Sequence, residues 1–298
     1  MVIMHEGVSW STKLLPVRLR ELWNNAQQNN LSSGEWAASQ RQELDECAAI
    51  WTRALLLRGE NVLVRSTLIE IGRWRGISDL ELVRHGCEGA LRSNKLDWER
   101  CVHRVEARQV EEYYDSADYY IDELMWWHTL AEDNSPLAYV AALEFALLAN
   151  CKTYLDFGSG VGSGALLFRS HGFEVSLGDI SNTMLSFCRY RFRERRREAS
   201  FLDLKQSQLP EGAFDFVTAM DVFEHLVDPG GAVESLHRCL KPGGYVYGRF
   251  SAEEEEEDRP QHIVRDFQPV FDRFMELGFK EVFHDDWLWG HQVFQKSS

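Results

Sequence analysis

The second half of the chain alternates short apolar runs with stretches of helical apolar spacing. The runs "TYLDF" (153–157), "EVSLGD" (174–179), "FDFVTAM" (214–220) and "YVYGRF" (245–250) are separated by segments such as "SNTMLSFCRYRF" (181–192). Strands that alternate with helices require crossover connections, so this pattern predicts an α/β fold with a mostly parallel sheet. The last two runs, "KEVFHD" (280–285) and "WLWGHQVFQ" (287–295), have no room for a crossover and are expected to be antiparallel.

The first half of the chain has a different pattern, in which apolar residues recur at helical spacing. Trp51 and Leu55 follow Ala48 in this way. Ser78, with Glu81 three residues on, predicts the start of a helix. "SPLAYVAALEFALLAN" (135–150) predicts another, with proline near its start. We therefore expect a helical amino-terminal domain at 1–135 and an α/β domain at 136–298.

The balance of charge limits the class of partner. The chain has 47 acidic and 32 basic residues, a formal net charge of −15. A nucleic-acid binder needs a surplus of Lys and Arg on at least one face, so we expect a small-molecule partner and no nucleic acid. The basic stretch "RYRFRERRRE" (189–198) interleaves Arg with Glu, which is typical of a solvated helix face.

The cysteines and the terminus indicate the compartment. Six cysteines are scattered without CxxC spacing, and the amino terminus lacks a basic-then-apolar signal pattern. No uncharged apolar run reaches membrane-spanning length. We expect a cytoplasmic protein that is not embedded in a membrane.

Glycines crowd the junction between the first predicted strand and the next helix, in "TYLDFGSGVGSGALLF" (153–168). Glycine in such number predicts a turn that lets a ligand approach the backbone. Open parallel sheets bind ligands at this edge. Gly160, Gly162 and Ala165 also fit G-x-G-x-x-G/A, with Asp179 following 19 residues after Gly160. On these residues alone, an NAD(P)-dependent oxidoreductase is one interpretation.

The acid before the glycines favours another interpretation. Asp156, Gly158, Gly160 and Gly162 form acid-x-Gly-x-Gly-x-Gly, and "VSLGDIS" (175–181), "FLDL" (201–204), "FDFVTAMDVFEHLVDP" (214–229) and "LKPGGYVYGRF" (240–250) follow in order. From about residue 136 onward the chain closely resembles the class I S-adenosylmethionine-dependent methyltransferases. The resemblance implies a Rossmann-like, mostly parallel seven-stranded sheet whose last strand is reversed.

The resemblance also implies a cofactor, S-adenosylmethionine, and the residues that bind it. Gly158 and Gly160 would pass under its methionine part, and Asp179 would accept hydrogen bonds from the ribose hydroxyls, a strong arrangement for a charged acceptor. The alternative for Asp179 is a structural role as the N-cap of the next helix, a role that Ser181 could also fill. The alternative for Asp203 is that it is an ordinary loop carboxylate without a ligand. In this set Asp156 orients the loop, and Asp203 and Leu204 meet the adenine. The full implied set consists of Asp156, Gly158, Gly160, Gly162, Asp179, Ile180, Asp203, Leu204 and Asp221.

Methyl transfer depends on alignment, and it needs a base only if the nucleophile carries a proton. Glu224 and His225 follow the fourth strand, and His262 lies on the loop after the fifth, so we take these residues as catalytic candidates. The same segment resembles quinone-biosynthesis O-methyltransferases, in which Asp221, Glu224 and His225 would be placed to hold a divalent ion. A structural hydrogen bond is the favoured use here, and we predict no metal site.

Aromatic residues are concentrated in "EEYYDSADYYIDELMWWHTL" (111–130). Such residues at helical spacing are more often core than binding site. In the family that the chain resembles, this region closes over the cofactor, so Tyr119, Tyr120, Trp127 and His128 are predicted to form a lid and substrate wall. Two functions stay open: a methyltransferase for a small molecule, and a cofactor-binding regulatory protein without turnover.

Overall fold

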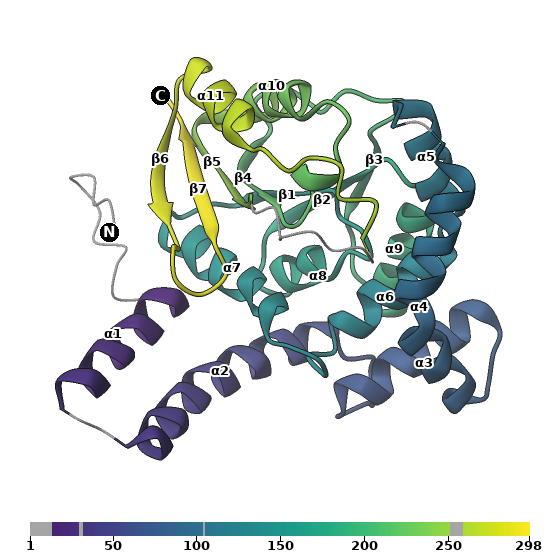
Figure 1. Cartoon of the computed structure of the whole chain (residues 1–298), viewed down its shortest axis with the longest axis horizontal. Coiled ribbons are helices and arrows are strands. Elements are labelled where there is room, and N and C mark those ends of the chain that lie inside the picture. The colour runs from purple at the N-terminus through teal and green to yellow at the C-terminus, as the bar shows by residue number, and fades with distance from the viewer. Residues whose placement is uncertain (1–13, 30–31, 104, 251–258) are drawn as a thin grey trace.

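The computed structural model describes residues 14–29, 32–103, 105–250 and 259–298. Its amino-terminal part is helical, as the apolar spacing predicts (Figure 1). The helices are α1 (Leu15–Gln28), α2 (Ser33–Leu55), α3 (Leu63–Arg75), α4 (Leu80–Cys101), α5 (Ala107–Ser116) and α6 (Asp118–Trp127).

The predicted start of α4 is wrong by one residue. The N-cap is Asp79, not Ser78, and its carboxylate accepts hydrogen bonds from the amides of Glu81 and Leu82. A carboxylate can accept both amides at once, and its negative charge is stabilised at the positive end of the helix dipole.

The carboxyl-terminal part contains the predicted sheet. Its strands are β1 (Thr153–Phe157), β2 (Glu174–Asp179), β3 (Ser200–Asp203), β4 (Phe214–Ala219), β5 (Leu240–Arg249), β6 (Phe279–His284) and β7 (His291–Lys296). They form one seven-stranded sheet in the order β3-β2-β1-β4-β5-β7-β6. β7 is antiparallel to both β5 and β6, and the pairs from β3 to β5 are parallel. This confirms the Rossmann-like sheet with a reversed last strand.

Helices cover both faces of the sheet. Tyr154 of β1 packs in one cluster with α7 (Ala138–Leu148), α8 (Ser163–Ser170) and α9 (Asn182–Glu194). Its neighbour Leu155 packs in another with α10 (Pro229–Cys239) and α11 (Gln268–Glu276). Successive side chains of a strand point to opposite faces, so β1 is buried on both sides and its carboxyl end is held firmly.

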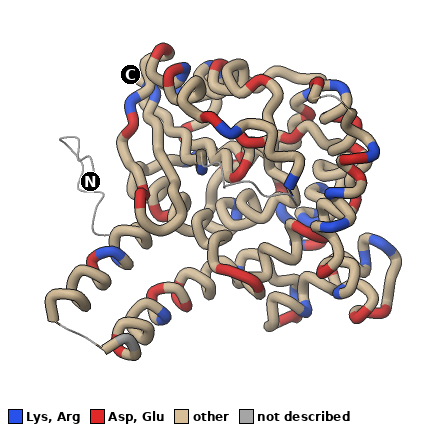
Figure 2. The backbone as a smooth tube through the Cα atoms, viewed as in Figure 1, with Lys and Arg blue, Asp and Glu red and all other residues tan. Residues whose placement is uncertain are grey.

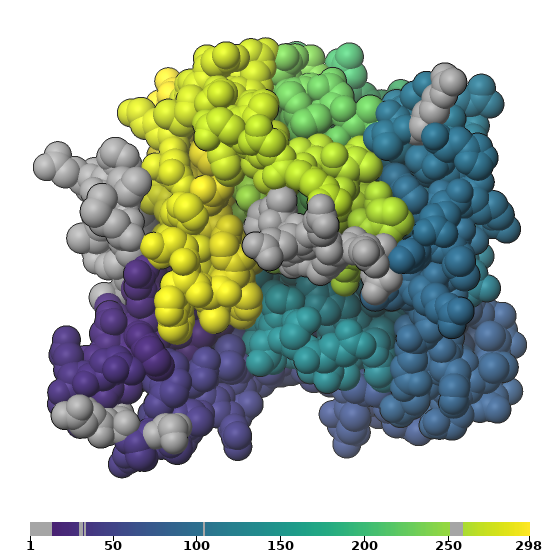
Figure 3. All heavy atoms as spheres, in the orientation of Figure 1, coloured from purple at the N-terminus to yellow at the C-terminus, as the bar shows by residue number. Residues whose placement is uncertain are grey.

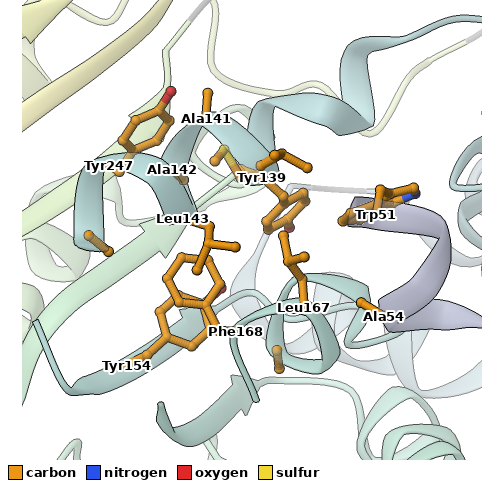
Figure 4. Close-up of a cluster of buried hydrophobic side chains, with 14 of the residues drawn as sticks. Trp51, Ala54, Tyr139, Ala141, Ala142, Leu143, Tyr154, Leu167, Phe168 and Tyr247 are labelled. Carbon is orange, nitrogen blue, oxygen red and sulfur yellow. The ribbon is translucent and has the colours of Figure 1, made fainter. Parts of the chain in front are cut away.

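The helical part shares a core with the sheet-bearing part (Figure 4). Trp51 of α2 stacks on Tyr139 of α7, with ring centroids 5.7 Å apart. Beneath them, Tyr154 of β1 stacks on Phe168 of α8 at 3.7 Å. A 3-10 turn (Ser135–Leu137) leads directly into α7 across the expected boundary. The division into domains at 1–135 and 136–298 stays a prediction.

Charged residues of both signs are interspersed along the backbone (Figure 2). The expectation that 189–198 is a solvated face is wrong for Arg191 and Arg195, whose side chains are only 2% and 5% exposed. The reason is Glu70 of α3, a buried partner that the local sequence does not show. Among the described residues, no helix has the length and apolar character of a membrane span.

Candidate functional site

A cavity of about 400 Å³ opens at the carboxyl ends of β1, β2 and β4. Residues of the helical part also line it, including Tyr120, Trp127 and His128. Figure 3 shows the helices α4–α6, the segment before β1 and the chain after β5 meeting on one face of the molecule. The cavity therefore lies where an open parallel sheet binds its ligands. Helices α4–α6 contribute another part of its wall, and the helices of the amino-terminal part, α1–α6, are together called the helical cover.

The glycine turn after β1 forms one side of this cavity. Gly158 and Gly160 line it, and both have positive φ angles of 69° and 48°. A Cβ atom on Gly160 would lie 2.8 Å from Leu124 of α6, so the turn and the helical cover are in close contact. Gly162 is not among the lining residues; it precedes α8, and a Cβ there would meet Leu177 and Cys188 in the core.

Asp156 lies behind the turn and does not line the cavity. Its carboxylate accepts hydrogen bonds from the amide of Ala165 at 3.0 Å and the hydroxyl of Thr218 at 3.1 Å. Burial raises its pKa to about 7. The first bond joins the end of β1 to the first turn of α8 and the second joins it to β4, an arrangement that suits the predicted orienting role.

Asp179, at the end of β2, faces the cavity. One carboxylate oxygen accepts from the amide of Gly160 and the other from the amide of Ser181, both at 2.8 Å. Burial raises the pKa of this carboxyl to about 6. Ser181 is the N-cap of α9 and accepts from the amide of Met184, so the helix-cap interpretation of Asp179 is wrong.

The adenine side of the predicted site is only partly in the cavity. Ile180 and Leu204 line it, and Asp203 does not. Asp203 pairs with Asp179 across β2 and β3, and its carboxylate accepts from the amide of Lys205. The role of Asp203 toward adenine stays a prediction.

Glu224, His225 and His262 meet in the wall of the cavity. Each offers a nitrogen or oxygen atom within 4.8 Å of the others. The loop that carries His262 is fixed because the amides of Ile263 and Val264 donate to the carbonyl of Glu224, at 2.8 and 3.0 Å. All three side chains line the cavity.

The protonation state of His225 follows from its surroundings. Burial and the neighbouring His262 lower its pKa to about 3, so the ring is neutral near pH 7. Its Nδ1 lies 3.1 Å from the carbonyl oxygen of Gln261, and a carbonyl can only accept. Nδ1 therefore carries the proton, and Nε2 is left as the basic nitrogen.

The residues that the resemblance implies for a divalent ion are not brought together as a set. Asp221 lines the cavity but forms an ion pair with Arg249 at 3.1 Å. Within the described part of the chain, the atoms that converge belong to Glu224, His225 and His262. The group that could hold a metal ion is therefore Glu224, His225 and His262, in place of the implied set, and the absence of a metal site stays a prediction.

The aromatic segment contributes to the cavity unevenly. Tyr120, Trp127 and His128 line it as predicted for a wall, whereas Tyr119 is 43% exposed and lies outside it. Tyr114 of α5, which the predicted wall does not include, is buried, lines the cavity and lies nearly perpendicular to the ring of His225, with ring centroids 6.2 Å apart. Adjacent tyrosines at 113–114 and 119–120 give no local signal of which ring faces the ligand.

Residues 155–248 match the family model described as a methyltransferase domain. The chain contains a methyltransferase domain. The match covers β1 to β5, which carry the glycine turn, Asp179 and His225. It confirms the resemblance to class I S-adenosylmethionine-dependent methyltransferases, and with it S-adenosylmethionine as the cofactor of this domain.

Curated relatives agree with this assignment. The chain is 32% identical over 130 residues to a ubiquinone biosynthesis O-methyltransferase of Pseudomonas paraeruginosa, covering 41% of this chain and 56% of the relative. It is 36% identical over 107 residues to a demethylmenaquinone methyltransferase of Thermus thermophilus, covering 35% and 49%. The chain thus spans about half the length of the curated relatives it matches. A Pyrococcus horikoshii protein of solved structure aligns with a TM-score of 0.46 at 19% identity, over 56% of this chain and 94% of that one.

Proposed function

We propose that this protein transfers a methyl group from S-adenosylmethionine to a small-molecule acceptor. The observation that carries the proposal is that one cavity joins the glycine turn, Asp179 and the histidines. The cofactor supplies an electrophilic methyl group. Each oxygen of the Asp179 carboxylate already accepts one backbone amide and retains capacity for a ribose hydroxyl, so this carboxylate fits the cofactor.

His225 is the proposed general base. It is neutral near pH 7, and the hydrogen bond to Gln261 leaves Nε2 as the acceptor of a proton from the nucleophile. Glu224 and His262 adjoin the ring and are placed to orient it or to receive the proton. A base at this position is useful to an acceptor that carries a proton, such as a hydroxyl group.

The wall of the cavity supports a flat, ring-bearing acceptor without a negative charge. Tyr114, Tyr120 and Trp127 provide aromatic surface. The two arginines that line the cavity are each paired with an acid there, Arg249 with Asp221 and Arg259 with Glu123. The names of the relatives, which refer to ubiquinone and demethylmenaquinone, support an acceptor of quinone type.

Product analysis tests the function. The protein is incubated with S-adenosylmethionine and a panel of phenols, quinols and amines, and S-adenosylhomocysteine is measured by mass spectrometry. We expect acceptor-dependent product that falls sharply in His225→Gln. Cofactor binding without product from any acceptor would favour the regulatory alternative, and binding of nicotinamide cofactors in place of S-adenosylmethionine would favour an oxidoreductase.

A further inference from the structure

Arg191 of α9 lies beneath the glycine turn and holds it from the inside. Its side chain is 2% exposed. One terminal nitrogen, Nη1, donates to the carbonyl of Val161 at 2.6 Å and to the hydroxyl of Ser163 at 2.9 Å. These two residues flank Gly162, so a single guanidinium fixes both sides of the point where the turn becomes α8.

The helical part supplies the charge that keeps Arg191 in place. Glu70 of α3 is fully buried, and its carboxylate lies 3.4 Å from Nε of Arg191. The two neighbouring arginines lower the pKa of Glu70 despite its burial, so it is ionised. A buried guanidinium without a counterion is strongly unfavourable. The position of Arg191 under the turn therefore depends on a residue more than 100 positions earlier.

A second residue of the helical part reaches the same hydroxyl. His128 lines the cavity, and its Nδ1 lies 2.9 Å from the Ser163 oxygen. Burial and Arg191 lower the pKa of His128 to about 3, so its ring is neutral. Arg191 and His128 therefore share the Ser163 hydroxyl, which can accept from the guanidinium while it bonds Nδ1.

We propose that Arg191, held by Glu70, is a positioning residue for the cofactor turn, and that the helical part thereby completes the cofactor site. The inference rests on the proposed function, since it concerns the affinity for S-adenosylmethionine and its product. It assigns a role to the helical part in addition to covering the acceptor: without the Glu70 charge, Val161 and Ser163 lose their common donor, and the turn is no longer preorganised for the cofactor.

Arg195, the C-cap of α9, provides a matched control one turn beyond Arg191. It pairs with the same Glu70 carboxylate, with Nη2 at 2.9 Å, and is equally buried. Its other bonds go to the carbonyls of Leu55 and Arg191, not to the glycine turn. Arg191→Met and Arg195→Met therefore both remove a buried charge from the same cluster, and only the first removes a contact with the turn.

Calorimetric titration of the full chain with S-adenosylhomocysteine separates the two roles. We expect both variants to lower Tm. We expect Arg191→Met to raise Kd about tenfold and Arg195→Met to leave it within about twofold. An equal change in Kd for the two variants, or no change for Arg191→Met, would overturn the proposal. If the wild-type chain does not bind, the proposed function has failed instead.

Ser163→Ala tests the same contact if Arg191→Met does not fold, which circular dichroism would show. This change keeps the ion pairs and removes the oxygen shared by Arg191 and His128. We expect the KM for S-adenosylmethionine to rise about threefold, with kcat within about twofold. An unchanged KM in a folded Ser163→Ala protein would count against the proposal.

Discussion

The sheet edge and the helical cover build the same cavity in different ways. On the edge, the residues that face the cavity lie at strand ends or in the turns after them: Asp179 is the last residue of β2, and His225 ends the 3-10 turn after β4. In the cover, Tyr114 and Leu124 reach the cavity from helices that precede β1. The residues proposed for the chemistry therefore come from the sheet edge itself. The exclusion of water from the cavity and the conformation of the glycine turn depend on packing between distant parts of the chain.

Removal of the cover is expected to have the largest effect. A chain that starts at Asp133 lacks Glu70 and Trp51, so Arg191 and Arg195 lose their counterion and Tyr139 loses its stacking partner. Breaking a buried ion pair by removing one partner costs roughly 3–5 kcal/mol, a large share of the stability of a domain. We expect loss of cooperative unfolding in scanning calorimetry. A sharp transition at the full-length Tm would show that the sheet does not need its cover.

Gly160→Val tests the contact between the glycine turn and helix α6 of the cover. The φ of 48° is strained for a β-branched residue, and the added Cβ would lie 2.8 Å from Leu124. We expect affinity for S-adenosylhomocysteine to fall on the order of 100-fold in calorimetry, because the turn must move. Gly172→Val is the control: its φ is 87°, no atom would lie within 4 Å of an added Cβ, and it is not among the cavity-lining residues. The control should lose stability and keep its affinity.

Asp179→Asn tests the edge alone. The substitution keeps the size, removes the charge that would face the ribose hydroxyls, and replaces one of the two oxygens that accept the amides of Gly160 and Ser181 with a donor. Cofactor binding should therefore weaken by about 1.5–3 kcal/mol or more. Asp203→Asn is the matched control on the neighbouring strand, since its side chain does not line the cavity. Unchanged affinity in Asp179→Asn would remove the ribose assignment, and weaker binding in Asp203→Asn would support its adenine contact.

The pH dependence distinguishes binding from chemistry. Asp179 has a pKa raised to about 6 and His225 one lowered to about 3. As the pH falls from 7 to 5.5, Asp156, whose pKa is raised to about 7, and then Asp179 become neutral and accept more weakly, while His225 stays unprotonated. We therefore expect the KM for the cofactor to rise between pH 7 and 5.5 before kcat falls. A kcat that halves near pH 6.5 would indicate a base with an ordinary histidine pKa.

Tyr114→Phe should have the smallest effect and acts on the cover. The Tyr114 hydroxyl is buried with no hydrogen-bond partner among the described residues, so its removal should not lower Tm. If the hydroxyl meets the acceptor, the acceptor KM should rise about two- to fivefold in steady-state assays. Tyr119→Phe, at an exposed position, is the control. Equal kinetics for the two variants would limit Tyr114 to a packing role.

Much of the edge could be predicted from the sequence because its signals are local. Periodicity marks the strands, and the order of the strand ends places Gly158, Asp179 and His225 together. The N-cap residue of α4 could not be predicted, since Ser78 and Asp79 are adjacent candidates and only the fold decides between them.

The cover could be predicted only as helical. Its contribution depends on which helix face packs against the sheet, and that choice is made by partners far along the chain. Arg191 looks like part of a solvated basic stretch until Glu70 is placed against it. Tyr114 and Tyr119 have similar local surroundings, yet one is buried at the cavity and the other is exposed.

The buried cluster of Glu70, Arg191 and Arg195 also constrains how such a chain can diverge. Loss of Glu70 would leave two buried arginines without a counterion, whereas loss of either arginine leaves the other paired with Glu70. We therefore expect homologous chains that keep Arg191 to keep Glu70 as well. A chain that retains Arg191 should then also contain a helix equivalent to α3. In sequences too divergent for that helix to be aligned, the arginine alone indicates that the helical cover is present.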